Sequence, residues 1–190
     1  MSGRGHTEAA IRRPPAAVRR VVGYLAWLLA ALLLAACSTP QPRAGTGEVA
    51  FVIVRHAEKA GGAGSDPALS DAGLERAAAL ARRLSGTSVA AVYTTDFRRT
   101  RDTVAPTAAA QGLAAIVYDA HAPADAVAAR LKAAHREGTV LVAGHSNTVP
   151  DIVAALCGCD VEAMDESEFD RISIVHIDAL GRARLETRRY

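Results

Sequence analysis

The sequence contains few aromatic residues and few cysteines. Phe, Trp and Tyr make up 4% of its 190 residues, which argues against stacking platforms for single-stranded nucleic acid. Three cysteines are too few for a disulfide-dense miniprotein, and no glycine repeat points to a collagen-like chain. The length, together with a hydrophobic content of 50%, instead allows one ordinary globular domain.

The basic charge of the chain is concentrated near its start. The formal net charge is +2, but residues 1–36 alone contain five arginines and one acidic residue, a net charge of +4. The other 17 basic and 19 acidic residues give the rest of the chain a net charge of −2. A body with this charge has no general attraction to nucleic acid or to an anionic membrane, so we expect no nucleic-acid partner.

The first 36 residues are organised like a secretion signal. Four arginines between positions 12 and 20 precede an uncharged, apolar run of 16 residues at 21–36. A membrane-spanning helix usually needs about 20 apolar residues, whereas the apolar core of a signal peptide needs roughly 7–15. The run therefore predicts a signal peptide over residues 1–36. An uncleaved membrane anchor is the alternative, and in either case the body of the protein lies outside the cytoplasm.

The segment Leu34-Ala35-Ala36-Cys37 resembles the lipobox of bacterial lipoproteins. This resemblance implies cleavage before Cys37, which would become an acylated first residue that anchors the protein in a membrane. We expect the protein to face the periplasm of a bacterial cell envelope, at the outer membrane because Ser38 is not aspartate. Residues 37–47 then form the lipidated cysteine and a linker, and residues 48–190 form the folded domain.

Strand and helix patterns alternate along this domain. Apolar runs rich in β-branched residues predict strands at 48–55, 88–94, 113–118 and 139–144. Helical patterns follow them at 70–84, 97–111, 123–135 and 149–156. Two last strands, at 172–177 and 182–187, are predicted to form a hairpin. The order predicts an α/β fold of three layers, α/β/α, with a mostly parallel central sheet and a terminal antiparallel hairpin at one edge.

Imidazole and guanidinium side chains follow the ends of these strands. Arg55-His56-Ala57-Glu58 follows the first strand, residues 95–101 follow the second, and Gly144-His145-Ser146-Asn147 follows the fourth. Ligands of such sheets bind beyond the carboxyl ends of the strands, so the two histidines are expected to meet there. Arginine binds phosphate oxygens in a bidentate manner, and a neutral imidazole can attack phosphorus. The pattern predicts phosphoryl transfer without a metal ion.

Four segments in this order resemble the histidine phosphatase superfamily, the phosphoglycerate mutase-like group. They are residues 51–58 (FVIVRHAE), 66–73 (DPALSDAG), 93–103 (YTTDFRRTRDT) and 142–147 (VAGHSN), within a match over about 48–156. The resemblance implies a phosphoglycerate mutase-like fold, no cofactor and no metal. It also implies that His56 is the phosphorylated nucleophile, and that Arg55, Arg99 and His145 complete the phosphate pocket. Arg99 is chosen rather than Arg98 because it stands four residues before Thr103.

The resemblance leaves the identity of the general acid open. The family often places a carboxylate after the third strand or beside the second histidine. Asp119 follows the third strand and is the candidate here, with Glu58 as the alternative. Asp119 could instead serve only as a structural cap of the helix near Pro123, and some small members of the family lack an evident general acid.

These residues predict a phosphomonoester or phosphohistidine hydrolase that acts as a monomer on a small phosphorylated substrate. One alternative is a phosphate-binding lipoprotein of the same fold without catalytic activity. Another is a serine esterase, because residues 144–148 resemble a G-x-S-x-G elbow around Ser146, although Thr148 replaces the last glycine. Asp170 and His176 would complete its triad, since they follow in the order that this fold requires.

Two further features receive no catalytic role. Cys157 and Cys159 are either two thiols or a labile disulfide. The acidic run at 165–170 is predicted to be a solvated loop, with a role in repelling or orienting the substrate as the alternative.

Overall fold

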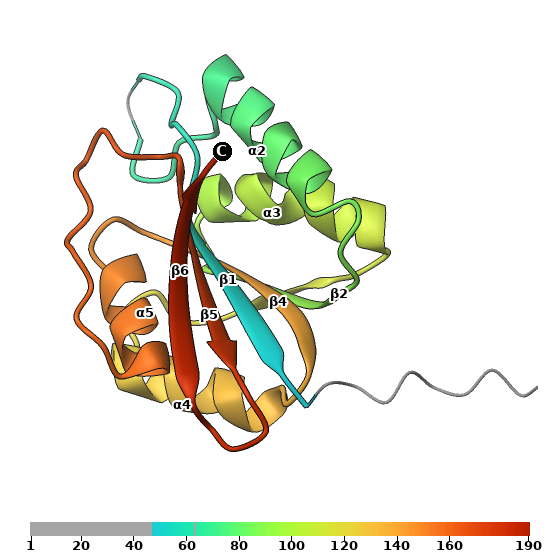
Figure 1. The fold of residues 1–190 in the computed structure, drawn as a ribbon. Helices are drawn as coiled ribbons and strands as arrows, with labels where there is room; N and C mark the ends of the chain where they lie inside the picture. Colours follow the sequence, from blue (N-terminus) through green and yellow to red (C-terminus); the bar gives the residue numbers. More distant parts are fainter. Residues whose placement is uncertain (1–46, 63) are drawn as a thin grey trace, which may run out of the picture. The chain divides into compact units, whose positions relative to one another are not determined.

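A six-stranded sheet in the order β3-β2-β4-β1-β5-β6 forms the centre of the computed structural model (Figure 1). The strands are β1 (Val49–Arg55), β2 (Val89–Thr94), β3 (Ala115–Val117), β4 (Gly138–Gly144), β5 (Arg171–Ile177) and β6 (Ala183–Arg189). The first four strands run parallel, and β5 and β6 are antiparallel to their neighbours. The mostly parallel sheet with a terminal hairpin is therefore confirmed.

The structure describes residues 47–62 and 64–190. The predicted signal peptide over 1–36, the proposed lipidation site Cys37 and the linker up to residue 46 lie outside the described residues. Within the ranges that are described, no helix has the length and apolar character needed to cross a membrane.

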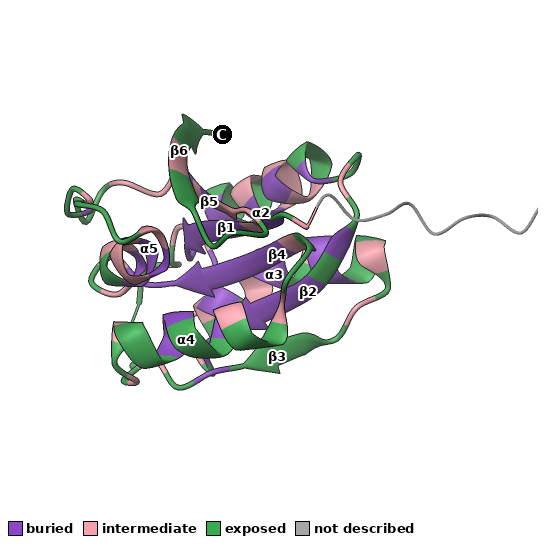
Figure 2. Ribbon diagram, turned by 60° about the horizontal axis from the view of Figure 1, so that its bottom comes forward, coloured by how far each residue is buried: buried purple, intermediate pink, exposed green. Residues whose placement is uncertain are grey.

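Helices cover both faces of the sheet and complete the three layers (Figure 1). They are α2 (Asp71–Arg83) and α3 (Arg98–Gln111) on one face, and α4 (Ala124–Ala134) and α5 (Val149–Cys157) on the other. Alternate residues of β1 enter the two cores: Val52 and Val54 pack with α2 and α3, whereas Phe51 and Ile53 pack with α4 and α5. Figure 2 shows β1, β2 and β4 buried, and β3 and β6 exposed. Every predicted element is present, with ends within two residues of the prediction.

The start of α2 is fixed against the loop that follows β1. The hydroxyl of Ser70 accepts a hydrogen bond from the N–H of Gly73 at 3.1 Å and so caps the helix. The N–H of Ser70 donates to the carbonyl oxygen of Glu58 at 2.9 Å. A Cβ atom at Gly73 would lie 2.2 Å from that same oxygen, so only glycine fits at this position. The segment at 66–73 thus holds the loop after His56 in place.

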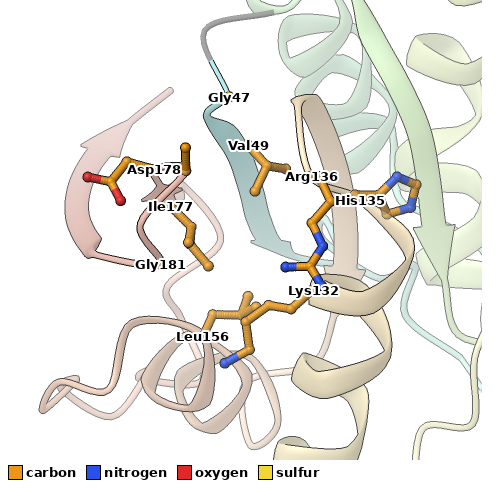
Figure 3. A pocket seen from close by; sticks show the side chains of 10 residues that line it. Gly47, Val49, Lys132, His135, Arg136, Leu156, Ile177, Asp178 and Gly181 are labelled. Atoms are coloured by element: carbon orange, nitrogen blue, oxygen red, sulfur yellow. The ribbon is translucent and has the colours of Figure 1, made fainter.

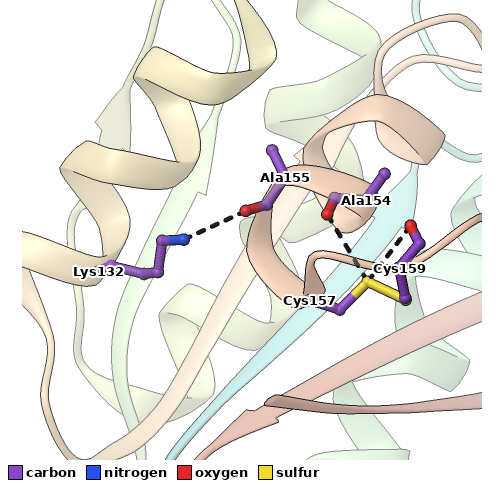
Figure 4. Close-up of a disulfide and its surroundings, with 5 residues drawn as sticks. All are labelled: Lys132, Ala154, Ala155, Cys157 and Cys159. Carbon is purple, nitrogen blue, oxygen red and sulfur yellow. Dashed lines mark hydrogen bonds between the residues drawn. A yellow bond between two sulfur atoms is a disulfide. The ribbon is translucent and has the colours of Figure 1, made fainter. Parts of the chain in front are cut away.

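A disulfide joins Cys157 and Cys159 just after the end of α5 (Figure 4). Beside it, the ammonium group of Lys132 donates to the carbonyl oxygen of Ala155 at 3.1 Å, which ties α4 to α5. Because α5 starts next to His145 and runs back along the sheet, the disulfide lies at the opposite end from that histidine.

A cavity of about 350 Å³ also lies at that opposite end of the sheet (Figure 3). The apolar side chains of Val49 and Leu156 and the charged side chains of Lys132 and Arg136 line it. Val49 is the first residue of β1, whereas His56 follows the last one. A strand rises about 3.3 Å per residue, so roughly 20 Å separates the cavity from the histidine.

Candidate active site

The carboxyl ends of β1 and β4 bring the two predicted histidines together. Arg55 ends β1 and pairs with Gly144, the last residue of β4. The N–H of His56 donates to the carbonyl oxygen of Gly144 at 2.9 Å, so the hydrogen bonding between β1 and β4 extends one residue beyond the end of β1. The ring centroids of His56 and His145 consequently lie 5.4 Å apart. Arg99 reaches the same place from the first turn of α3.

His56 presents one ring nitrogen for chemistry. Its Nδ1 lies 2.8 Å from the carbonyl oxygen of Ala57, so Nδ1 carries the proton and donates it. The Nε2 atom then keeps its lone pair. Burial lowers the pKa of His56 to about 4, an effect that the hydrogen bond to Ala57 partly opposes and the charge of Arg55 reinforces. A neutral imidazole with a free Nε2 is a nucleophile at neutral pH.

His145 is enclosed by the segment that links β2 to α3. Its Nε2 lies 3.1 Å from the hydroxyl oxygen of Thr95, and its Nδ1 lies 3.5 Å from Nη2 of Arg99. The ring of Phe97 packs edge-on against the imidazole at 5.2 Å between centroids. Burial, followed by the charge of Arg99, lowers the pKa of His145 to about 4. The second histidine is therefore neutral as well near pH 7.

The guanidinium group of Arg55 is held by the acidic segment before β5. Its Nη1 donates to the carbonyl oxygens of Asp165, Glu166 and Glu168 at 3.0, 2.8 and 3.1 Å. Its Nη2 donates to the carboxylate of Glu166 at 2.8 Å, and its plane lies over the ring of Phe169 at 4.1 Å. Residues 165–167 are exposed, as predicted for a solvated loop, but the backbone of this segment also positions a buried arginine, which the sequence did not predict.

Both arginines have one N–H group without a protein partner among the described residues. The Nε atoms of Arg55 and Arg99 are buried and have no hydrogen-bond partner among the described residues. Arg99 packs over Phe97 at 4.2 Å, and its Nη1 lies 3.7 Å from a carboxylate oxygen of Asp66. Two guanidinium groups beside two neutral imidazoles can bind the oxygens of a tetrahedral oxyanion.

Asp119, the candidate general acid, lies on an exposed loop after β3. One of its carboxylate oxygens accepts the N–H of His121 at 2.9 Å. Asp119 and Phe97 line the same surface groove, and Phe97 in turn contacts His145. Within residues 47–62 and 64–190, Asp119 has no hydrogen bond or ion pair with the histidines or arginines of the site.

Glu58, the alternative acid, is bound to Arg76 of α2. Three contacts of 2.6, 2.9 and 2.9 Å join the carboxylate to the guanidinium. Hydrogen bonding to Arg76 lowers the pKa of Glu58, so this group is a carboxylate without a proton at neutral pH. The pair serves to join the loop after β1 to α2 and is a poor source of a proton for a leaving group.

Three residues at the site were not predicted from the sequence. Glu166 binds Arg55 and also accepts a hydrogen bond from the hydroxyl of Ser146 at 2.5 Å. Thr95 binds His145, and Thr100 binds Thr95 at 2.7 Å. The two threonines lie inside residues 93–103, one of the four segments that resemble the family. Their position in that segment could have indicated that they belong to the site. No spacing in the sequence connects Glu166 to Arg55.

No group of three or more His, Cys, Asp or Glu side chains in the described part of the chain could hold a metal ion. Arg55 and Arg99 place two guanidinium groups at the site.

Comparison with known proteins identifies the fold and shows a family resemblance over part of the chain. Residues 51–121 match the histidine phosphatase superfamily (branch 1). No curated protein matches the chain significantly. Among solved structures, the protein histidine phosphatase SixA complexed with tungstate is 25% identical, with a TM-score of 0.63 over 74% of this chain and 96% of that chain.

Two more distant structures share the fold. A mycobacterial glucosyl-3-phosphoglycerate phosphatase is 18% identical, with a TM-score of 0.58 over 73% of this chain and 97% of that chain. Bacillus stearothermophilus YhfR is 15% identical, with a TM-score of 0.59 over 72% and 95%. The phosphoglycerate mutase-like fold is thus confirmed. The segment that matches the model of the histidine phosphatase superfamily, residues 51–121, includes His56 and Arg99, and the solved structure of a protein histidine phosphatase is similar over most of the chain.

Proposed function

We propose that the protein is a metal-independent phosphomonoester or phosphohistidine hydrolase that acts through a phosphohistidine intermediate on His56. One observation carries the proposal. A buried, neutral His56 with a free Nε2 lies beside two arginines whose buried Nε–H groups lack partners among the described residues. The similarity to the protein histidine phosphatase SixA supports a substrate that carries a phosphoryl group on oxygen or nitrogen.

In the first step, Nε2 of His56 attacks phosphorus in line with the leaving group. A P–N bond forms while the bond from phosphorus to the leaving atom breaks. Arg55 and Arg99 bind the equatorial oxygens through their free N–H groups, and His145 donates a hydrogen bond to them as negative charge develops. Asp119 protonates the leaving atom from the adjoining groove.

In the second step, water attacks the phosphohistidine. The carboxylate of Asp119 accepts a proton from that water, the P–N bond breaks, and its electron pair returns to Nε2 of His56. The hydrogen bond from Nδ1 to Ala57 keeps the ring in one tautomer through both steps. Inorganic phosphate leaves, and the enzyme is regenerated with all protons accounted for.

The esterase alternative is not supported by the contacts of Ser146. Its hydroxyl donates to the carboxylate of Glu166, which is not a base paired with a histidine. His176, which a serine triad would require, is bound to Glu48 at 2.7 Å near the other end of β1.

Labelling with a ³²P substrate tests the intermediate. We expect acid-labile, alkali-stable label on the peptide that contains His56, and His56→Ala should abolish both label and turnover. His176→Ala serves as the control and should retain both. Activity should also survive EDTA. Label on Ser146, full activity in His56→Ala, or a loss of activity in EDTA that Mg²⁺ or Zn²⁺ restores would contradict the proposal.

We also propose that the protein is anchored in the membrane of a bacterial cell envelope through acylated Cys37, facing the periplasm. The apolar run at 21–36 and the segment Leu34-Ala35-Ala36-Cys37 at its end support this proposal. Cys37→Ser should remain an unprocessed precursor without lipid label. Normal processing and acylation of that variant would rule out the lipobox.

A further inference from the structure

A buried chain of hydrogen bonds runs from His145 to the first turn of α3. Nε2 of His145 lies 3.1 Å from Oγ1 of Thr95, which lies 2.7 Å from Oγ1 of Thr100. Oγ1 of Thr100 lies 2.7 Å from the carbonyl oxygen of Phe97. Both threonines are fully buried, so water does not compete for these bonds.

The carbonyl oxygen at the end of this chain fixes the direction of every bond in it. Oγ1 of Thr100 also lies 3.1 Å from the carbonyl oxygen of Thr95. A carbonyl oxygen only accepts, so the single hydroxyl proton of Thr100 is donated to a carbonyl group, and the shorter contact is to Phe97, as is common for threonine in a helix. Thr100 must then accept the proton of the Thr95 hydroxyl. Thr95 in turn has no proton left for His145 and must accept the Nε2–H of that ring. Neutral His145 is therefore the Nε2–H tautomer.

This tautomer turns a lone pair, not a proton, toward the phosphate pocket. The Nδ1 atom of His145 faces Nη2 of Arg99 at 3.5 Å, a long contact that suits a nitrogen without hydrogen. An oxyanion held by Arg99 would meet the lone pair of Nδ1 and be repelled. The second histidine can bind such an oxygen only after Nδ1 has gained a proton.

We propose that oxyanion binding is coupled to uptake of one proton at Nδ1 of His145, and that Thr95 is the positioning residue that imposes this coupling. The inference rests on the proposed phosphate site and deepens it. The proton comes from solvent when the anion binds and returns to solvent when inorganic phosphate leaves. Between these events His145 is an imidazolium that donates Nδ1–H to an equatorial oxygen.

The charges around His145 favour this sequence. Positive or titratable groups act on it from β1, from the loops after β1 and β3 and from α3: Arg55, His56, Lys59, His121 and Arg99. Burial and these groups together hold the His145 ring neutral in the free enzyme. Glu166, whose carboxylate accepts a hydrogen bond from the neighbouring Ser146, adds one negative charge at the edge of the pocket. A dianion placed between Arg99 and His145 reverses the local field, so protonation becomes favourable only when the pocket is filled.

Binding of tungstate to the full chain tests the coupling without turnover. Calorimetry at pH 7.0–8.5 in buffers of different ionisation enthalpy measures the protons taken up per tungstate, which stays dianionic in this range. We expect uptake by Thr95→Ser to equal that of the wild type, because the hydroxyl remains. Thr95→Val should take up about one proton fewer, because His145 can then adopt the Nδ1–H tautomer. For each pH unit, the Kd of this variant should therefore change about tenfold less than the Kd of the wild type.

A second variant makes the test independent of any packing change at Thr95. Thr100→Val leaves the hydroxyl of Thr95 free to turn and donate to Nε2 of His145, so it should also lose about one proton of uptake. Equal uptake by the wild type, Thr95→Val and Thr100→Val would overturn the inference, as would a wild type that takes up no proton. Hydrolysis of p-nitrophenyl phosphate by the same wild-type sample tests the proposed function separately. Proton-coupled tungstate binding without hydrolysis would reject the hydrolase and keep the coupling.

Discussion

Glu166 accepts a hydrogen bond at 2.8 Å from Nη2 of Arg55, the same guanidinium group whose Nε has no partner among the described residues. The other oxygen of this carboxylate accepts from the hydroxyl of Ser146. A substrate phosphate that approaches Arg55 must therefore compete with the carboxylate of Glu166 for the same guanidinium group. Hydrogen bonding to Ser146 and the charge of Arg55 lower the pKa of Glu166, so the group is ionised at neutral pH.

Glu166→Gln should consequently strengthen oxyanion binding. The substitution removes the negative charge and keeps the shape of the side chain. Because the Glu166 side chain is 79% exposed, solvent screens the repulsion, and we expect Kd for tungstate or phosphate to fall by about 3- to 10-fold. Titration calorimetry at constant pH measures the change.

Glu162→Gln is the matched control, since it makes the same change of charge at an exposed position of the same loop. We expect it to leave Kd unchanged within about twofold. Weaker binding by Glu166→Gln would mean that the carboxylate orders the loop around Arg55 more than it competes with the ligand.

The roles of Arg98 and Arg99 should separate clearly by mutation. Arg99 lies beside His145 with 15% of its side chain exposed, whereas Arg98 is 60% exposed and pairs with Asp102 at 3.5 Å. Arg99→Ala should lower kcat/KM by about 10²- to 10³-fold, the scale of one lost transition-state donor. Arg98→Ala should stay within about twofold of the wild type. Equal losses in the two variants, measured with one phosphoester, would argue against Arg99 as a ligand of the phosphoryl group.

The sequence predicted the three layers and the order of strands and helices along the chain because its local signals agree with the fold. The apolar run of β1 has one face in each core, which explains why it lacks alternation and looks like a strand buried on both sides. Ser70 and Gly112 mark helix ends by mechanisms that act within a few residues, a capping hydroxyl and a left-handed backbone.

The part of the site that escaped prediction depends on contacts between distant segments. Arg55 and Glu166 are separated by 111 positions, and no periodicity or motif signals that the acidic loop folds back over β1. For Glu58, the neighbour that decides its state is Arg76, 18 positions away on α2. The protonation states and tautomers of His56 and His145 likewise depend on burial and on bonds to Ala57 and Thr95, which only the fold creates.

The role proposed for Asp119 predicts a dependence on the leaving group. A general acid matters when the departing atom is strongly basic and matters little for p-nitrophenolate. Asp119→Asn should therefore lower kcat/KM for alkyl phosphates by about 10²-fold or more and leave p-nitrophenyl phosphate within about threefold. Asp96→Asn, which alters another carboxylate of the same groove, is the control. If Asp119→Asn affected all leaving groups equally, Asp119 would have only a structural role, as the acceptor of the N–H of His121 in that turn.

The two buried histidines also predict how stability depends on pH. Burial lowers the pKa of both His56 and His145 to about 4, below the value of about 6.5 expected in the unfolded chain. Between pH 6.5 and pH 4 the unfolded chain binds protons that the folded protein does not. The free energy of unfolding should therefore fall as the pH is lowered through this window, and be fully present above it.

Urea unfolding between pH 7 and pH 5 measures this loss, which we expect to be about 2 kcal/mol for each of the two histidines. The carboxylates with lowered pKa values, such as Glu58, contribute only at still lower pH, and the upper part of the range therefore isolates the imidazoles. His56→Gln and His145→Gln should each flatten the pH dependence by that amount, because glutamine does not titrate. His121→Gln, at an exposed position, is the control.

Burial also lowers the pKa of His135, so some pH dependence of the free energy of unfolding should persist when both site histidines are replaced. A slope unchanged in both variants would show that folding does not lower the pKa of either ring, which would contradict the burial effect assigned to the two histidines.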